Sequence, residues 1–220
     1  MIKNLIVDNI LEEPDAIVDY ALQQEYAPSE GGKWPGRRSG SMDERVFWSI
    51  ANPMGNALYG SFENIDIDMN FQISDPLIDP SKKNQDDIHN RGWIHKDNMF
   101  HVTAGVIYLS KNPEDHTGTS LYTEIDSEPL EVEERIRIIE TKKAHFLGKE
   151  CDNYEDTWLK HNTRFEETVR VKNVYNRLVV FGEEVWHGVH TYGKYKPRLT
   201  VVWFLNGIVS NGKCYGTFRK

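Results

Sequence analysis

The segment Ile65-Asp66-Ile67-Asp68-Met69-Asn70-Phe71-Gln72-Ile73 alternates strictly between apolar and polar side chains. Successive side chains of a β-strand point to opposite faces, so one face of this segment is apolar and the other is polar. Such alternation is typical of a strand with a hydrophobic core on one side. The sequence therefore predicts a β-rich fold organised around residues 65–73.

Short apolar segments suited to strands recur in the second half of the chain. They lie at residues 103–110, 118–122, 165–171, 177–181, 185–190 and 198–206. Many short strands after an N-terminal helix favour a mainly β protein with flanking helices, built as a double-stranded β-helix, the jelly roll of the cupins. Because there is no internal repeat or linker, residues 1–220 are expected to form a single domain.

Two helices and one loop are expected around these strands. Pro14 suits a first helical turn and apolar residues follow at spacings of three or four, which predicts a helix over 13–25. Residues 129–147 have the charge pattern of an amphipathic helix with a basic end. Residues 28–42 are rich in Gly, Pro and Ser, so we expect a mobile loop that can act as a lid.

The charge balance bears on the kinds of partner. A net charge of -8 gives no overall electrostatic footprint for a nucleic acid. The basic cluster Lys33, Arg37, Arg38 and Arg45 is the exception, and it is either a solvated loop or a site that holds an anionic substrate. We therefore expect a small-molecule or side-chain substrate and no nucleic-acid partner.

The sequence also carries signals about cellular compartment. Residues 1–9 lack the zones of a signal peptide, and no apolar run approaches the length of a membrane span. Cys151 and Cys214 are then best interpreted as reduced thiols, although a disulfide between them remains an alternative. These features predict a cytoplasmic protein without a membrane partner.

The pair His95 and Asp97 is the first candidate metal-binding motif. Residues two apart on a strand share a face, so both side chains can reach one ion. A motif this short is weak alone, and His95 can equally be a hydrogen-bonded strand histidine beside a turn aspartate. A third ligand must come from a distant segment, where His187 and His190 are the candidates.

The order of these residues resembles the 2-oxoglutarate and Fe(II)-dependent dioxygenase superfamily, which includes the prolyl hydroxylases. The resemblance covers about residues 60–206. It is carried by His95-Lys96-Asp97, the strand ending in Tyr108-Leu109-Ser110, Trp186-His187, and Arg198-x-Thr200. It implies a jelly roll in which His95, Asp97 and His187 bind Fe(II) and act in catalysis. His187 is preferred to His190 because it lies 11 residues before Arg198, the superfamily's usual interval.

The resemblance also implies a co-substrate site. Arg198 would grip the distal carboxylate of 2-oxoglutarate through its planar guanidinium, and Thr200 would add a hydroxyl. Tyr108 or Tyr122 would contribute a phenolic hydrogen bond, unless these rings belong to the core. His101 is expected to line the pocket at most, and we expect the remaining histidines to be exposed: His89, His116, His145 and His161.

The implied reaction is oxidative decarboxylation of 2-oxoglutarate by O2, coupled to hydroxylation of an unactivated C–H bond and release of succinate and CO2. Halogenating relatives lack the carboxylate that Asp97 provides here, so hydroxylation is favoured. Two other functions stay open: a 2-oxoglutarate-independent cupin-like metalloenzyme, and a non-catalytic jelly-roll binding domain. The sequence identifies neither the substrate nor the oligomeric state.

Overall fold

The computed structural model describes residues 4–59, 64–77, 88–97, 102–210 and 213–216. The helices are α1 (Pro14–Leu22), α2 (Glu44–Tyr59), α3 (Val132–Phe146) and α4 (Tyr154–Asn162), with single 3-10 turns at η1 (Glu30–Gly32) and η2 (Ile88–Asn90). The strands are β1 (Asn4–Asp8), β2 (Tyr26–Pro28), β3 (Arg37–Ser39), β4 (Asn64–Ser74), β5 (Thr103–Tyr108), β6 (Thr119–Glu124), β7 (Phe165–Val171), β8 (Arg177–Gly182), β9 (Trp186–Val189), β10 (Arg198–Ser210) and β11 (Lys213–Gly216).

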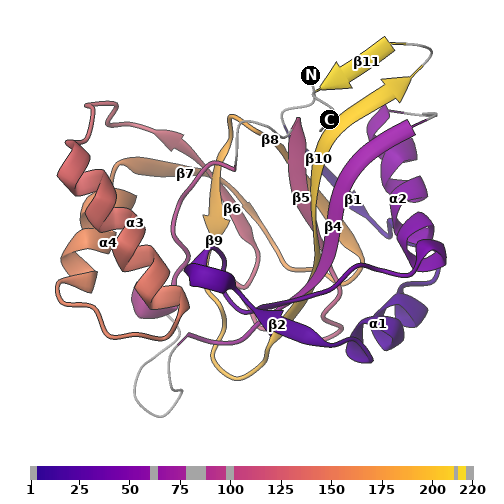
Figure 1. Cartoon of the computed structure of the whole chain (residues 1–220), viewed down its shortest axis with the longest axis horizontal. Helices are drawn as coiled ribbons and strands as arrows, with labels where there is room; N and C mark the ends of the chain where they lie inside the picture. Colours follow the sequence, from indigo (N-terminus) through magenta and orange to yellow (C-terminus); the bar gives the residue numbers. More distant parts are fainter. Residues whose placement is uncertain (1–3, 60–63, 78–87, 98–101, 211–212, 217–220) are drawn as a thin grey trace.

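The strands pair antiparallel in two sheets (Figure 1). The larger sheet has the order β1-β8-β5-β10-β4-β3-β2, with β11 beside β10, and the smaller sheet has the order β7-β6-β9. The alternating segment 65–73 forms most of β4, which pairs with β10 from Arg198↔Ser74 onward. The prediction of a jelly roll with flanking helices is confirmed.

Strand β10 shows how the period of two separates the core from the site. Leu199, Val201 and Trp203 face the main hydrophobic core. The alternate side chains, Arg198 and Val202 among them, face a cavity on the other side of the large sheet. The period of two of the strand backbone thus directs every second side chain of β10 toward the site.

Helices α1 and α2 cover the core face of the large sheet. Ile17 and Ala21 of α1 and Ile50 and Met54 of α2 are buried in the same cluster as Phe71 of β4. The expected helix over 13–25 is confirmed as α1, whereas α2 had no sequence-based prediction. Figure 1 shows this pair on one side of the molecule and α3 with α4 on the other.

Helices α3 and α4 pack on each other and on the chain that leads into His95. Trp93 shares a buried cluster with Tyr154 and Trp158 of α4. The expected helix over 129–147 is confirmed as α3, and α4 is a further element that the sequence patterns did not reveal. Helix α4 thus holds the chain segment that carries His95, and α3 packs on α4.

The prediction of one irregular loop over 28–42 is wrong in part. The segment contains η1 and β3, and β3 pairs with the edge of β4 through Arg37↔Ile73 and Arg38↔Gln72. Gly32 has φ +67° and packs against α3, where an added Cβ would lie 2.4 Å from the Lys143 carbonyl oxygen. Local composition carries no information about pairing with a distant strand, so the Gly, Pro and Ser content of residues 28–42 predicted a loop.

No described helix is long and apolar enough to cross a membrane. Cys151 has a free thiol. The side chain of Cys214 lies outside the described residues.

His145 of α3 contradicts the expectation that it is exposed, because it is buried. Its Nε2–H donates to the His89 carbonyl oxygen at 2.6 Å, and its Nδ1 accepts from the Trp93 indole N–H at 3.4 Å. Burial lowers the pKa of His145 to about 4, against the opposing effect of the bond to His89. The imidazole is therefore neutral in the folded protein at pH values where an unfolded histidine is half protonated.

We expect this histidine to make the protein less stable in acid. Between pH 7 and pH 5 the unfolded state binds a proton at residue 145 and the folded state does not, so the free energy of unfolding falls by about 2 kcal/mol from this residue alone. Urea denaturation of the wild type and His145→Gln at both pH values measures it. The variant should lose less stability on acidification, whereas His116→Asn, at an exposed position, should behave as the wild type. Equal pH dependence of wild type and His145→Gln would contradict the assignment.

Candidate functional site

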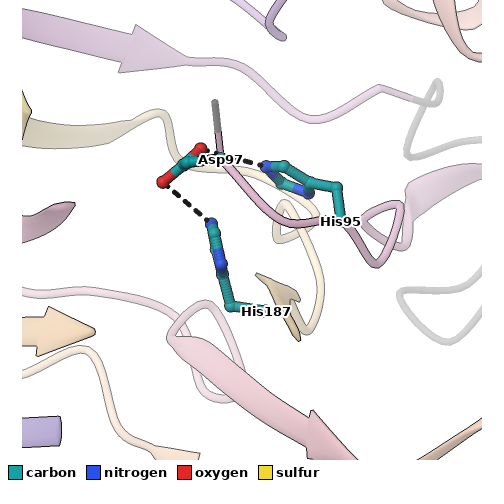
Figure 2. A group of neighbouring side chains, drawn as sticks. All are labelled: His95, Asp97 and His187. Atoms are coloured by element: carbon teal, nitrogen blue, oxygen red, sulfur yellow. Dashed lines mark ion pairs between the residues drawn. The ribbon is translucent and has the colours of Figure 1, made fainter. Parts of the chain in front are cut away.

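Three side chains, those of His95, Asp97 and His187, converge on one another (Figure 2). His95 Nε2 lies 3.9 Å from Asp97 Oδ1, and His187 Nε2 lies 3.5 Å from Asp97 Oδ2. One ligand atom from each of the three lies within 4.8 Å of the others. The two segments, 90 residues apart in sequence, thus bring together two imidazoles and one carboxylate.

Backbone pairing sets the separation of the two histidines. His95 N donates to the His187 carbonyl oxygen at 2.9 Å, and His187 N donates back to the His95 carbonyl oxygen at the same distance. His187 lies on β9, but His95 forms only an isolated bridge. The expectation that His95 lies on a regular strand is therefore wrong, because this single pair of hydrogen bonds is enough to hold it.

Both imidazoles have the tautomer that a metal ligand needs. The Nδ1 atom of His95 lies 2.8 Å from the Trp93 carbonyl oxygen, and that of His187 lies 3.0 Å from the Val185 carbonyl oxygen. A carbonyl only accepts, so Nδ1 carries a proton in both rings, and Nε2, which faces Asp97, is the atom that can bind a metal. Burial, then the charge of Lys142 and then that of His187, holds the pKa of His95 well below its usual range.

Helix α4 holds the backbone next to His95. The Asn162 side-chain oxygen accepts from Ile94 N at 3.2 Å, and His161 Nε2 donates to the Ile94 carbonyl oxygen at 2.7 Å. The expected exposure of His161 is wrong for this reason. No short-range pattern links His161 with His95, and only the packing of α4 brings them together.

Arg198, at the start of β10, is buried with 5% of its surface exposed. Within the described part of the chain, its Nε and Nη2 atoms have no hydrogen-bond partner. Its Cζ atom lies 5.2 Å from the centre of the Tyr108 ring, and Thr200 is buried two residues further along the strand. A buried guanidinium without a counter-charge is costly, so this arrangement suits an anionic ligand.

Tyr108 lies beneath Arg198 with its hydroxyl engaged inside the protein. The hydroxyl is 2.9 Å from Thr119 Oγ1 of β6, and the ring is fully buried. Thr119 itself lines the cavity. Tyr108 therefore supports Arg198 and orients a cavity hydroxyl, while Tyr122 is half-buried and does not line the cavity in the described part of the chain.

The three converging residues and Arg198 line one cavity of about 660 Å³. Its apolar walls include Val106, Phe181, Val202 and Phe204. Lys33, Trp34, Pro35 and Arg38, from the segment 28–42 that was expected to act as a lid, also line it, as does Lys142 of α3. The volume lies within the range of about 300–1,000 Å³ found for small-molecule sites.

The competing histidine points elsewhere. His190 Nδ1 lies 3.5 Å from Glu167 Oε2, and its ring centre lies 5.7 Å from that of His116. The geometry thus distinguishes His187 from His190 as the neighbour of Asp97. His101, a possible pocket residue, lies outside the described residues.

The chain belongs to a family of unknown function, DUF6445, which matches residues 3–193. No curated protein matches it in sequence.

Solved structures with a similar fold include a prolyl hydroxylase from Trichoplax adhaerens in complex with a hypoxia inducible factor oxygen degradation domain peptide fragment. It is 11% identical with a TM-score of 0.52, over 92% of this chain and 82% of that chain. HygX from Streptomyces hygroscopicus, with nickel and 2-oxoglutarate bound, is 10% identical with a TM-score of 0.51, over 98% and 85% of the two chains. The chain therefore has the fold of the 2-oxoglutarate and Fe(II) oxygenases, and the resemblance in the sequence is confirmed at this level.

Proposed function

We propose that this member of the family is a non-haem Fe(II) and 2-oxoglutarate-dependent dioxygenase that hydroxylates an unactivated C–H bond with release of succinate and CO2. The observation that carries the proposal is the buried guanidinium of Arg198, whose Nε and Nη2 atoms have no partner among the described residues, in the same cavity as His95, Asp97 and His187. A metal-binding group alone would suit many enzymes. An unsatisfied buried cation beside it is what 2-oxoglutarate, a dicarboxylate, requires.

The donor set fits Fe(II). Two neutral imidazoles and one carboxylate are the ligands of the facial triad in non-haem iron oxygenases, which leaves positions open for co-substrate and O2. The bonds from Nδ1 to the Trp93 and Val185 carbonyls fix the orientation of both rings and favour binding through Nε2. Asp97 supplies a negative charge that compensates part of the charge of Fe(II).

Arg198 fits the distal carboxylate of 2-oxoglutarate. Its Nε and Nη2 atoms form one edge of the guanidinium, so they can donate two parallel hydrogen bonds to a carboxylate. The Tyr108 ring covers one face of the guanidinium and keeps its charge away from water. Thr200, on the same face of β10, offers a hydroxyl to the same group.

The remaining task of the protein is to keep water out and to hold the substrate carbon near the open side of the triad. Fe(II) and 2-oxoglutarate, when bound, supply the activation of O2 that the amino acids cannot provide. The apolar walls at Val106, Phe181, Val202 and Phe204 lower the water content of the cavity.

Succinate formation from 2-oxoglutarate tests this function directly. The purified protein should release succinate only when Fe(II), 2-oxoglutarate and O2 are all present, and release should increase with a compound that the enzyme oxidises. Oxidation of that compound without 2-oxoglutarate would point to a cupin-like metalloenzyme. Binding of Fe(II) without any consumption of 2-oxoglutarate across a broad panel of compounds would point to a binding domain.

A further inference from the structure

The cavity is strongly basic in a protein whose net charge is -8. Its described lining includes Lys33, Arg38, Lys96, Lys142 and Arg198 but a single carboxylate, that of Asp97. The charges of Fe(II) and 2-oxoglutarate would cancel each other, so the proposed cofactors leave this excess unchanged. Lys96 donates to Glu184 Oε2 at 3.1 Å and is compensated. Arg38 and Lys142 therefore carry positive charge that the proposed cofactors do not compensate.

Arg38 is held rigidly with its outer nitrogens unused. Its Nε donates to Gln72 Oε1 at 2.7 Å, and its Cζ lies 4.3 Å from the centre of the Trp34 ring. Gln72 is fixed in turn by the Pro35 carbonyl and the Ser74 hydroxyl. Within the described residues, the Nη1 and Nη2 atoms of Arg38 donate no hydrogen bond. Nη1 and Nη2 of Arg38 can therefore donate hydrogen bonds to a bound ligand.

Lys142 of α3 contributes a second cation to the cavity lining. The residues three and four positions away on α3 are Ile138, Ile139, His145 and Phe146, so no helical neighbour can form an ion pair with it. No ion pair to its ammonium occurs in the described part of the chain. Burial lowers the pKa of Lys142 to about 8 and that of Arg38 to about 10, with the charge of Asp97 opposing both shifts. Within the described residues, Asp97 is the one anion that acts on both side chains, and neither side chain forms an ion pair.

A close backbone approach keeps the two cations on the same cavity. Gly32 packs on the Lys143 carbonyl, and no residue with a Cβ would fit there without displacing α3. This contact joins the segment that carries Arg38 to the helix that carries Lys142. The cavity volume of about 660 Å³ favours a small molecule over a large chain as the occupant.

We propose that the compound oxidised at this site is a small molecule with an anionic oxygen group, a carboxylate or a phosphate, bound between Arg38 and Lys142. This inference rests on the proposed function for the role of the cavity, and it names the substrate class. The bound anion would fix one end of the molecule, so that a carbon at the other end faces the open side of the triad. Hydrogen bonds between charged groups of this kind are strong in a partly dry cavity.

Anion binding tests the proposal without turnover. The protein is loaded with Ni(II) and saturated with 2-oxoglutarate, so that Arg198 is occupied, and is then titrated by calorimetry with inorganic phosphate in one series and with acetate in another. We expect at least one of the two anions to bind. Arg38→Gln and Lys142→Met should each weaken that binding by about tenfold or more, the effect of one charged hydrogen bond. Lys143→Met, on the same helix but outside the cavity, is the matched control and should bind as the wild type.

The outcomes separate this inference from the proposed function. Binding of 2-oxoglutarate but of neither anion, or anion binding unaffected by both substitutions, would overturn the substrate class and leave the dioxygenase proposal intact. Anion binding that depends on Arg38 and Lys142 in a protein that does not bind 2-oxoglutarate would support the anion site and overturn the dioxygenase proposal. A loss of 2-oxoglutarate affinity in Arg38→Gln would assign this arginine to the co-substrate and overturn the inference. The anion that binds identifies the group as carboxylate or phosphate.

Discussion

Replacement of His187 by glutamine is expected to weaken metal binding by more than about 100-fold, while the same replacement of His190 leaves it unchanged. His187 contributes one of the two imidazoles that lie near Asp97 in the described part of the chain, whereas His190 faces Glu167. Even residues that only orient a metal ligand affect affinity by about 10–100-fold, and loss of a ligand itself should cost more. Titration of each variant with Fe(II) or Ni(II) in the absence of O2 measures the difference.

His187→Gln and His190→Gln form a matched pair of variants, because the two histidines lie three residues apart and both follow Trp186. Loss of metal binding in His190→Gln with retention in His187→Gln would exclude the proposed ligand set. Thermal unfolding of both variants without metal serves as the control for folding. Asp97→Asn, which keeps the shape of the side chain but removes its charge, should resemble His187→Gln.

Replacement of Arg198 by lysine is expected to weaken 2-oxoglutarate binding by about tenfold to a hundredfold with little effect on metal affinity. Lysine keeps the positive charge but loses the planar pair of donors, which corresponds to about 1–3 kcal/mol. Calorimetric titration of 2-oxoglutarate into the Ni(II)-loaded variant measures the change. Because Arg198 is buried and its Nε and Nη2 have no protein partner within the described residues, the substitution removes ligand contacts and few internal ones.

Arg177→Lys is the control for this experiment. Arg177 lies on β8 and pairs with Asp8, and it does not line the cavity in the described part of the chain. It should bind 2-oxoglutarate as tightly as the wild type. Unchanged affinity in Arg198→Lys would remove the residue from the co-substrate site, and with it the main support for 2-oxoglutarate as the co-substrate.

The elements that sequence analysis predicted well are those whose signal is local. The alternation at residues 65–73 and the apolar run at 198–206 match β4 and β10, because a strand with one buried face needs a period of two. Residues 13–25 and 129–147 match α1 and α3 for the corresponding reason in helices. Helices α2 and α4 were missed, since their burial depends on sheets built from distant residues.

For the candidate site, too, some features follow from local sequence and others from tertiary contacts. The sequence by itself determined the residue types and their order: a histidine and an aspartate two apart, a later histidine, and an arginine at the start of an apolar strand. Only the tertiary structure decided that His187 and not His190 adjoins Asp97, that His145 is buried and His161 half-buried, and that Arg38 and Lys142 line the same cavity. The physical reason is that these relations depend on pairing and packing between segments tens of residues apart, such as the His95–His187 bridge and the contact of Gly32 with α3. Periodicity within one segment carries no information about such contacts.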